Sequence, residues 1–238
     1  MEGQSYWRRC TERIGIRTGI LAAGLALIAV GGGHAKDPAA TIKARFGRLH
    51  NQFKELSTHS RVIKGNVKTG QRILSRELKE TPAFHSLMRV NSKGKVVNEV
   101  VRERSPGEKF RDVSRQKWFA SAGPRMKSYY TYVRRGDEPY RLFWARPLAI
   151  KTRGGAFRSA GALVAVVDIR TALGQVASKI GRPFRVAYEG TTIHSHRWDK
   201  NLKANARTLE IPGMSGLRLW YAAGGAAARD GAKAKAAS

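Results

Sequence analysis

The stretch GALVAVVDIRTALGQVASKIG, from Gly161 to Gly181, predicts a buried strand that is followed at once by a helix. Its first part, from Gly161 to Val167, contains no polar side chain, as is typical of a strand inside a core. Asp168 is a favoured helix N-cap, and Gly181 stands where the following helix should end. The chain must therefore combine strands and helices in one fold.

Hairpin patterns occupy most of the sequence on either side of this stretch. The first hairpin is expected to have strands at Phe84 to Val90 and Val96 to Val101, joined by the tight turn NSKG. A second hairpin is expected to turn at residues 135–137. A short helix is expected at residues 116–122. Successive hairpins with few helices indicate a mainly antiparallel sheet and an α+β fold. The remaining strands are expected at 129–133, 140–150 and 161–167, on both sides of a turn at 189–190, and around 212–213.

Apolar residues between Ile42 and Leu74 recur at alternating steps of four and three, which predicts one long helix over residues 42–78. Pro82 is expected to close this segment. The apolar stripe can pack on the sheet, which we favour, or form the seam of a homodimer through this helix. The opposite face is basic and carries Lys43, Arg48, Lys54, Arg61, Lys64, Lys68, Arg72 and Arg76.

The chain is strongly basic, since its 238 residues include 45 Lys and Arg against 17 Asp and Glu, a formal net charge of +28. This charge predicts attraction to anions and has no bearing on the fold. A hydrophobic content of 42% is sufficient for a core. The single cysteine, Cys10, excludes a disulfide framework and any metal site built from several cysteines of one chain.

The N-terminal region has the layout of an export signal. The apolar run ILAAGLALIAV at residues 20–30 follows four arginines and precedes the small-residue segment GGGHAKD. We interpret residues 1–35 as a signal peptide or an N-terminal membrane anchor, the anchor using residues 18–34 in the inner membrane. Either places the folded part in the periplasm or outside the cell, which argues against nucleic acid as a partner.

At the other end, the Ala/Lys-rich tail 223–238 has no large apolar side chain and is expected to be disordered.

Four segments, taken in order, resemble the extracytoplasmic Cache sensor domains, which are PAS-like modules of bacterial chemoreceptors and histidine kinases. The segments are VNSKGKVV in the first hairpin, FRDVSRQKWFASA, GALVAVVDIRTAL at the strand-to-helix junction, and VAYEGTTIHSH. The resemblance implies a single Cache-like domain over residues 40–222. Its fold would be α+β, with a PAS-like antiparallel sheet and a long N-terminal helix packed on it.

The same resemblance implies a ligand site. In Cache domains that bind amino acids, an arginine before an aromatic pair holds the ligand carboxylate, a tyrosine on the next strand contributes, and a later aspartate holds the ammonium group. Carried over to this chain, the pattern implies a site for a small organic anion or an amino acid, formed by Arg115, Trp118, Phe119, Tyr130, Tyr132 and Asp168. Two positions depart from the pattern: Arg115 lies three residues before Trp118 instead of two, and Phe119 replaces tyrosine.

Each of these residues also has a purely structural interpretation. Trp118 and Phe119 can close the hydrophobic core, as most buried aromatic side chains do. Asp168 can serve only as the N-cap of the helix that starts at Ile169. Arg115 can simply be solvated. The sequence leaves both interpretations open.

No enzyme or metal motif has the required spacing. GNVKTGQR has Gln71 where a phosphate loop needs lysine, and GMSGL misses the spacing of a nucleophile elbow. His194 and His196 share a face of a predicted strand, but no third metal ligand is close to them in sequence. We therefore expect no catalytic residue, metal or cofactor.

Together these observations favour a non-catalytic, small-ligand-binding sensor that signals through a membrane receptor or kinase partner. The alternative is a basic exported module that adheres to anionic envelope polymer or lipid.

Overall fold

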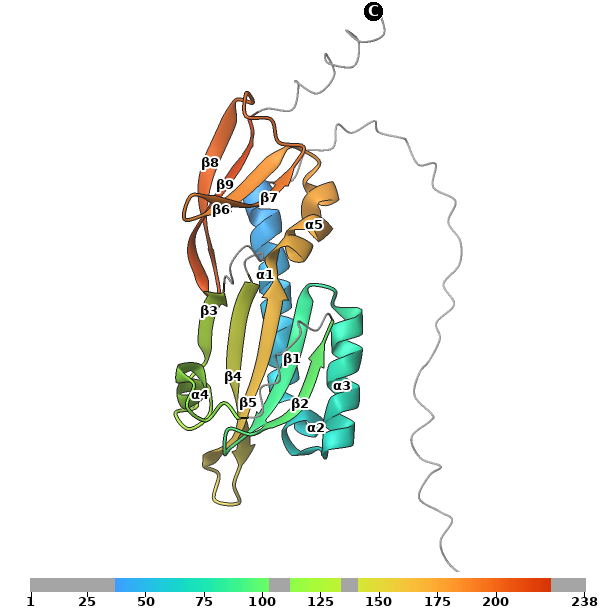
Figure 1. The fold of residues 1–238 in the computed structure, drawn as a ribbon, viewed down its shortest axis with the longest axis vertical. Coiled ribbons are helices and arrows are strands. Elements are labelled where there is room, and N and C mark those ends of the chain that lie inside the picture. Colours follow the sequence, from blue (N-terminus) through green and yellow to red (C-terminus); the bar gives the residue numbers. More distant parts are fainter. Residues whose placement is uncertain (1–36, 103–111, 134–140, 224–238) are drawn as a thin grey trace, which may run out of the picture. The chain divides into compact units, whose positions relative to one another are not determined.

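A computed structural model describes residues 37–102, 112–133 and 141–223, which are drawn in colour in Figure 1. The segment interpreted as a signal peptide or anchor, almost all of the Ala/Lys-rich tail, and the predicted turn at 135–137 lie outside these residues. Among the helices described, none combines the length and the apolar character that a membrane span requires.

A five-stranded antiparallel sheet forms the first part of the fold, in the order β2-β1-β5-β4-β3. The apolar strand of the opening stretch, β5, lies at its centre and pairs with β1 on one side and β4 on the other. The predicted α+β fold with an antiparallel sheet is therefore confirmed. The strands are β1 (Phe84–Asn91), β2 (Val96–Val101), β3 (Tyr129–Val133), β4 (Arg141–Lys151) and β5 (Phe157–Asp168).

A second antiparallel sheet follows, which the sequence had not separated from the first. It has four strands in the order β7-β6-β9-β8. Helix α5 (Ile169–Ile180) connects the two sheets; it is capped by Asp168 and ends at Gly181, whose φ of 68° is left-handed, as predicted. The strands are β6 (Phe184–Tyr188), β7 (Thr191–His196), β8 (Ala204–Ile211) and β9 (Met214–Ala222).

The prediction of one continuous helix over residues 42–78 is wrong. The segment forms three helices, α1 (Pro38–Thr58), α2 (Ser60–Lys64) and α3 (Val67–Glu80). His59 and Gly65 are both extended, which interrupts the helical hydrogen bonds twice. Asn66 then starts α3 as an N-cap, its side chain accepting a hydrogen bond from the Thr69 amide at 2.8 Å.

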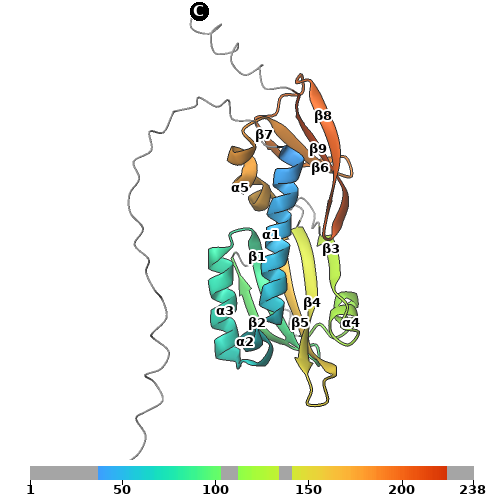
Figure 2. The ribbon, with the colours of Figure 1, turned by 180° about the vertical axis from the view of Figure 1, so that it is seen from behind.

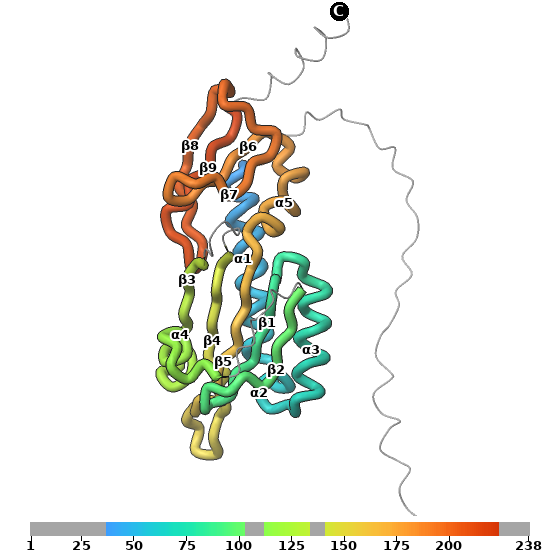
Figure 3. Tube along the Cα trace, in the orientation of Figure 1, coloured from blue at the N-terminus to red at the C-terminus, as the bar shows by residue number. Residues whose placement is uncertain are grey.

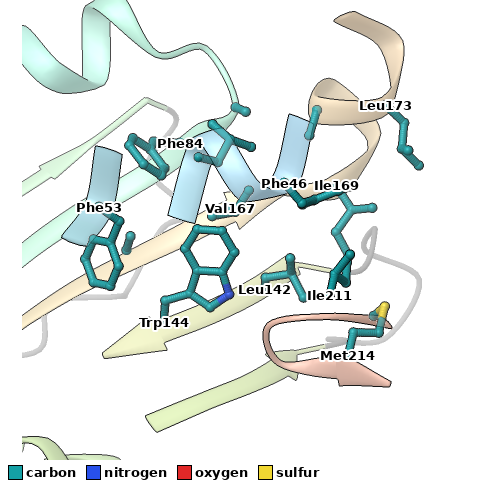
Figure 4. Packing of buried hydrophobic residues seen from close by; sticks show 14 of the residues in the cluster. Phe46, Phe53, Phe84, Leu142, Trp144, Val167, Ile169, Leu173, Ile211 and Met214 are labelled. Atoms are coloured by element: carbon teal, nitrogen blue, oxygen red, sulfur yellow. The ribbon is translucent and has the colours of Figure 1, made fainter. Parts of the chain in front are cut away.

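The apolar stripe of α1 is buried within the chain itself. Ile42, Phe46, Leu49 and Phe53 are 0% exposed, in one cluster with side chains from both sheets and from α5. Figure 2 shows α1 running across the five-stranded sheet and on toward the second, and Figure 4 shows Phe53 of α1 beside the indole of Trp144. The apolar stripe of α1 therefore packs within the chain, as we favoured, and does not form an exposed dimer seam. A homodimer through segment 42–78 would need its exposed faces instead.

The hairpin β8–β9 reaches back to the first sheet and holds the two sheets together (Figure 3). The indole Nε1 of Trp144 on β4 donates a hydrogen bond to the Pro212 carbonyl at 2.8 Å. Gly213 has a φ of 90°, and a Cβ there would lie 2.9 Å from the Thr131 carbonyl oxygen on β3. Only glycine permits this close approach between the two backbones.

We expect the substitution Trp144→Phe to lower the free energy of unfolding by about 1–3 kcal/mol, because the Pro212 carbonyl would lose its buried donor. Urea denaturation followed by circular dichroism measures this. Phe157→Leu is the control, since Phe157 is 62% exposed and its replacement should change stability by about 0.5 kcal/mol at most. Equal stability of the Trp144 variant and the unmodified chain would contradict the role of this hydrogen bond.

Candidate functional site

The five-stranded sheet has two different faces, because successive side chains of a strand point to opposite sides. On β4, Leu142 and Trp144 belong to the core that α1 covers, and we call this side the α1 face. Phe143 and Ala145 point the other way, onto a second cluster in which α4 (Lys117–Ala122) packs. We call that side the α4 face; Figure 1 shows α4 beside β3 and β4.

The predicted aromatic pair lies on the α4 face, and its two members differ. Phe119 is 3% exposed and packs with Val113, Ala122 and small or β-branched side chains of β1, β4 and β5. Trp118 is only half-buried; its ring meets Phe119 edge-on at 5.9 Å and lies 5.3 Å from the ring of Phe143. Phe119 is therefore a core residue, whereas Trp118 keeps part of its surface accessible.

Asp168 ends β5 and acts as the N-cap of α5, its Oδ1 accepting a hydrogen bond from the Thr171 amide at 2.8 Å. The structural interpretation of this residue is thus correct. The cap uses one of two carboxylate oxygens, so it does not exclude a ligand contact. Asp168 has the same strand parity as Val164, which faces α4, and it lies opposite Arg141 in the β4–β5 register. Both side chains are half-buried at the end of the sheet.

Tyr130 and Tyr132 lie on the α1 face, away from Trp118. The Tyr130 hydroxyl is 3.0 Å from Nε2 of His50 and accepts a hydrogen bond from Nη1 of Arg146 at 3.1 Å. The Tyr132 hydroxyl donates to Oε1 of Glu189 at 2.9 Å, an interaction that raises the pKa of Tyr132 to about 12.

The structure therefore does not bring the six predicted residues together. Trp118, Phe119 and Asp168 share the α4 face, and Arg115 is exposed in the turn before α4. The two tyrosines are one position out of phase, since neighbouring residues of a strand face opposite sides. Tyr129, which packs with the α4-face cluster, and Thr131 are the β3 residues with the correct parity.

A further set of half-buried residues occupies the α4 face between Trp118 and Asp168. Their neighbours on the α1 face, such as Leu142 and Val167, are fully buried, so these positions are where the sheet is less completely covered. Burial alternates along residues 141–144 of β4, but the sequence RLFWA does not alternate between polar and apolar residues, so it gave no signal that could have identified them. By register and parity they are Ser86, Thr131, Arg141, Phe143 and Val166.

A separate cluster of polar groups sits between α1 and the sheet. Arg146 links the Tyr130 hydroxyl to the Ser57 hydroxyl, the latter at 3.1 Å from its Nε, and His50 stacks edge-on against Trp144 at 5.5 Å. Burial, and then the positive charges of Arg146 and Lys54, lower the pKa of His50 below its usual value.

We expect this cluster to make the fold less stable as the pH falls. A histidine with a lowered pKa in the folded state binds its proton more readily when unfolded, so stability is lost below about pH 6.5. The variant His50→Gln should show a smaller loss of unfolding free energy between about pH 7.5 and 5.5 than the unmodified chain. Denaturation curves at each pH measure the difference, and parallel curves for the two proteins would show that His50 does not titrate in this way.

Arginines line hollows elsewhere in the described part of the chain. One of about 610 Å³ lies on the exposed face of the second sheet, where the guanidinium of Arg185 stands 4.4 Å from the ring centre of Trp220. Another of about 300 Å³ lies between α2 and α3, beside Arg61, Arg72 and Arg76. Within the described ranges, no three His, Cys, Asp or Glu residues are grouped as a metal site requires.

Comparison with known proteins identifies the fold. No protein-family model and no curated protein sequence matches the chain. Among solved structures, 77% of the chain superposes on the periplasmic domain of Vibrio cholerae LuxQ, covering 96% of that domain, with 11% identity and a TM-score of 0.50. The extracellular domain of the histidine kinase vpHK1S-Z8 gives 12% identity and a TM-score of 0.52 over 77% of this chain and 88% of that one.

A domain of a sensory box/GGDEF family protein from Vibrio parahaemolyticus gives 12% identity and a TM-score of 0.51, over 77% of this chain and 92% of that one. The chain thus has the fold of periplasmic and extracellular sensor domains. The predicted resemblance to Cache-type, PAS-like modules is confirmed at the level of the fold.

Proposed function

We propose that this chain is a sensor domain located in the periplasm or outside the cell, and that it binds a small organic anion or an amino acid on the α4 face. The fold it shares with sensor domains of signalling proteins supports the general role. The proposed site is supported by the half-buried residues between Trp118 and Asp168. On the opposite face of the same sheet the corresponding positions are filled by the core, so a ligand has more room on the α4 face.

The side chains on this face suit a small polar ligand. Trp118 and Phe143 offer an aromatic wall that excludes water and so strengthens nearby polar contacts. The guanidinium of Arg141 can donate two parallel hydrogen bonds to a carboxylate, and the exposed Arg115 can add charge at the edge. Asp168 can accept a hydrogen bond from an ammonium group. A ligand contact from Tyr130 or Tyr132 would require a ligand on the α1 face, where α1 packs.

We propose further that the role is non-enzymatic and that the signal passes to a membrane receptor or kinase partner. The neighbouring folds come from a LuxQ periplasmic domain, a histidine kinase and a sensory box protein, which supports this role. Ligand binding alone can supply a signal when the ligand favours one of two conformations.

The site is tested by the variants Trp118→Ala and Asp168→Asn. Asparagine caps a helix about as well as aspartate, so Asp168→Asn keeps α5 intact and removes only the charge. A thermal-shift screen of carboxylates, amines and sugars first identifies a ligand of the unmodified chain. At 100 times its dissociation constant, such a ligand should stabilise the fold by about 2.7 kcal/mol. We expect Trp118→Ala to remove this effect for any ligand of the site, and Asp168→Asn to remove it for ligands that carry an amine.

Tyr130→Phe is the matched control, since Tyr130 lies on the α1 face and should leave the ligand response unchanged. An undiminished response in both site variants would reject the α4 face as the site. High salt separates this function from adhesion to a polyanion, because binding to a polyanion weakens steeply as salt increases, whereas binding in a small site weakens less.

A further inference from the structure

A basic hollow lies between α1, α5 and the turn that follows α3, away from the α4 face. Its volume is about 340 Å³, which is within the range of small-ligand sites. Helix α1 contributes three residues spaced along one side, and α5 contributes three more. The lining residues are Arg45, Arg48, Gln52, Glu80, Thr81, Pro82, Gln175, Val176 and Lys179.

Cations outnumber carboxylates in this hollow. Arg45, Arg48 and Lys179 face a single acidic residue, Glu80. Glu80 is itself shared with Arg76, whose Nε lies 3.9 Å from its Oε1 on the outer side of α3. The charges of Arg45 and Arg48 repel each other, and an anion bound in the hollow would relieve this repulsion.

Arg45 shows this imbalance most clearly. It is half-buried, and burial together with the neighbouring charge of Arg48 lowers its pKa. One of its terminal nitrogens donates to the side-chain oxygen of Gln175 on α5. Its Nε is buried and has no hydrogen-bond partner within the described part of the chain. A buried donor without an acceptor is costly, and the excess of positive charge in the hollow adds to that cost, which a bound anion would offset.

We propose that this hollow binds a small divalent oxyanion, such as a phosphate group or a dicarboxylate. Three cations against one carboxylate leave two positive charges to neutralise, which favours a divalent over a monovalent ligand. Guanidinium groups match the planar, two-pronged geometry of carboxylate and phosphate oxygens. Gln52 and Gln175 add neutral amides that complete the hydrogen bonding.

Occupation of the hollow would join α1 to α5. The anion would link α1, which closes the shared core, to the helix that connects the two sheets. This site is independent of the ligand proposed for the α4 face, because the two sets of residues have no member in common.

The probe is inorganic phosphate at about pH 8, where it is mainly divalent, titrated into the full chain by calorimetry at constant ionic strength. The double variant Arg48→Gln/Lys179→Gln removes two exposed cations of the hollow. We expect it to weaken phosphate binding by about tenfold or more, because charge-assisted hydrogen bonds are lost. Acetate, which is monovalent, should bind the unmodified chain at least about tenfold more weakly than phosphate.

The control Lys43→Gln/Lys68→Gln removes the same charge from exposed positions on α1 and α3 that do not line the hollow, and should change the affinity by about twofold at most. Trp118→Ala should leave phosphate binding unchanged, which separates this site from the α4 face. Equal weakening by the two double variants would show general charge attraction and overturn the proposal. So would acetate binding as tight as phosphate, or the absence of saturable phosphate binding to the unmodified chain.

Discussion

The buried row of side chains on α1 is the constraint on which the rest of the structure depends. Ile42, Phe46, Leu49 and Phe53 enter a core that includes side chains of β4 and β5 in the first sheet and of β8 and β9 in the second. Neither sheet has a separate core on this side, because α1 packs against strands of both, while α3 packs on β1 and β2 and α5 packs on β7. Because the α1 face is filled in this way, the ligand site that we propose lies on the opposite face of the five-stranded sheet.

Two arginines of the described residues bind backbone carbonyl oxygens at the ends of helices. Arg89 is buried, yet its Nη1 donates to the carbonyls of Val62 and Gly65, both at 2.8 Å, at the end of α2. Arg102 similarly donates to the carbonyls of Leu78 and Thr81 at the end of α3. Carbonyls at helix ends carry partial negative charge, so these arginines stabilise helix termini.

Local patterns predicted the individual elements well and their arrangement less well. The junction at Asp168 was predicted to be a strand, a cap and a helix, and it is all three, because each signal depends on adjacent residues. The helix over 42–78 was predicted without its breaks, since the periodic stripe continues across His59 and Gly65 while the backbone does not. The sequence did not show that Tyr130 and Tyr132 lie on the opposite face from Trp118 while Tyr129 shares its face, because this depends on how β3 packs in the sheet.

By itself, the sequence determined the fold class, the positions of the hairpins and the likeness to extracytoplasmic sensor domains, since these follow from periodicity, turn residues and short motifs. Only the tertiary structure decided that the strands divide into two sheets, which face of the first sheet stays accessible, and that Arg45, Arg48 and Lys179 line one hollow. The physical reason is that these features arise from packing between residues far apart in the chain, and such packing leaves no local pattern.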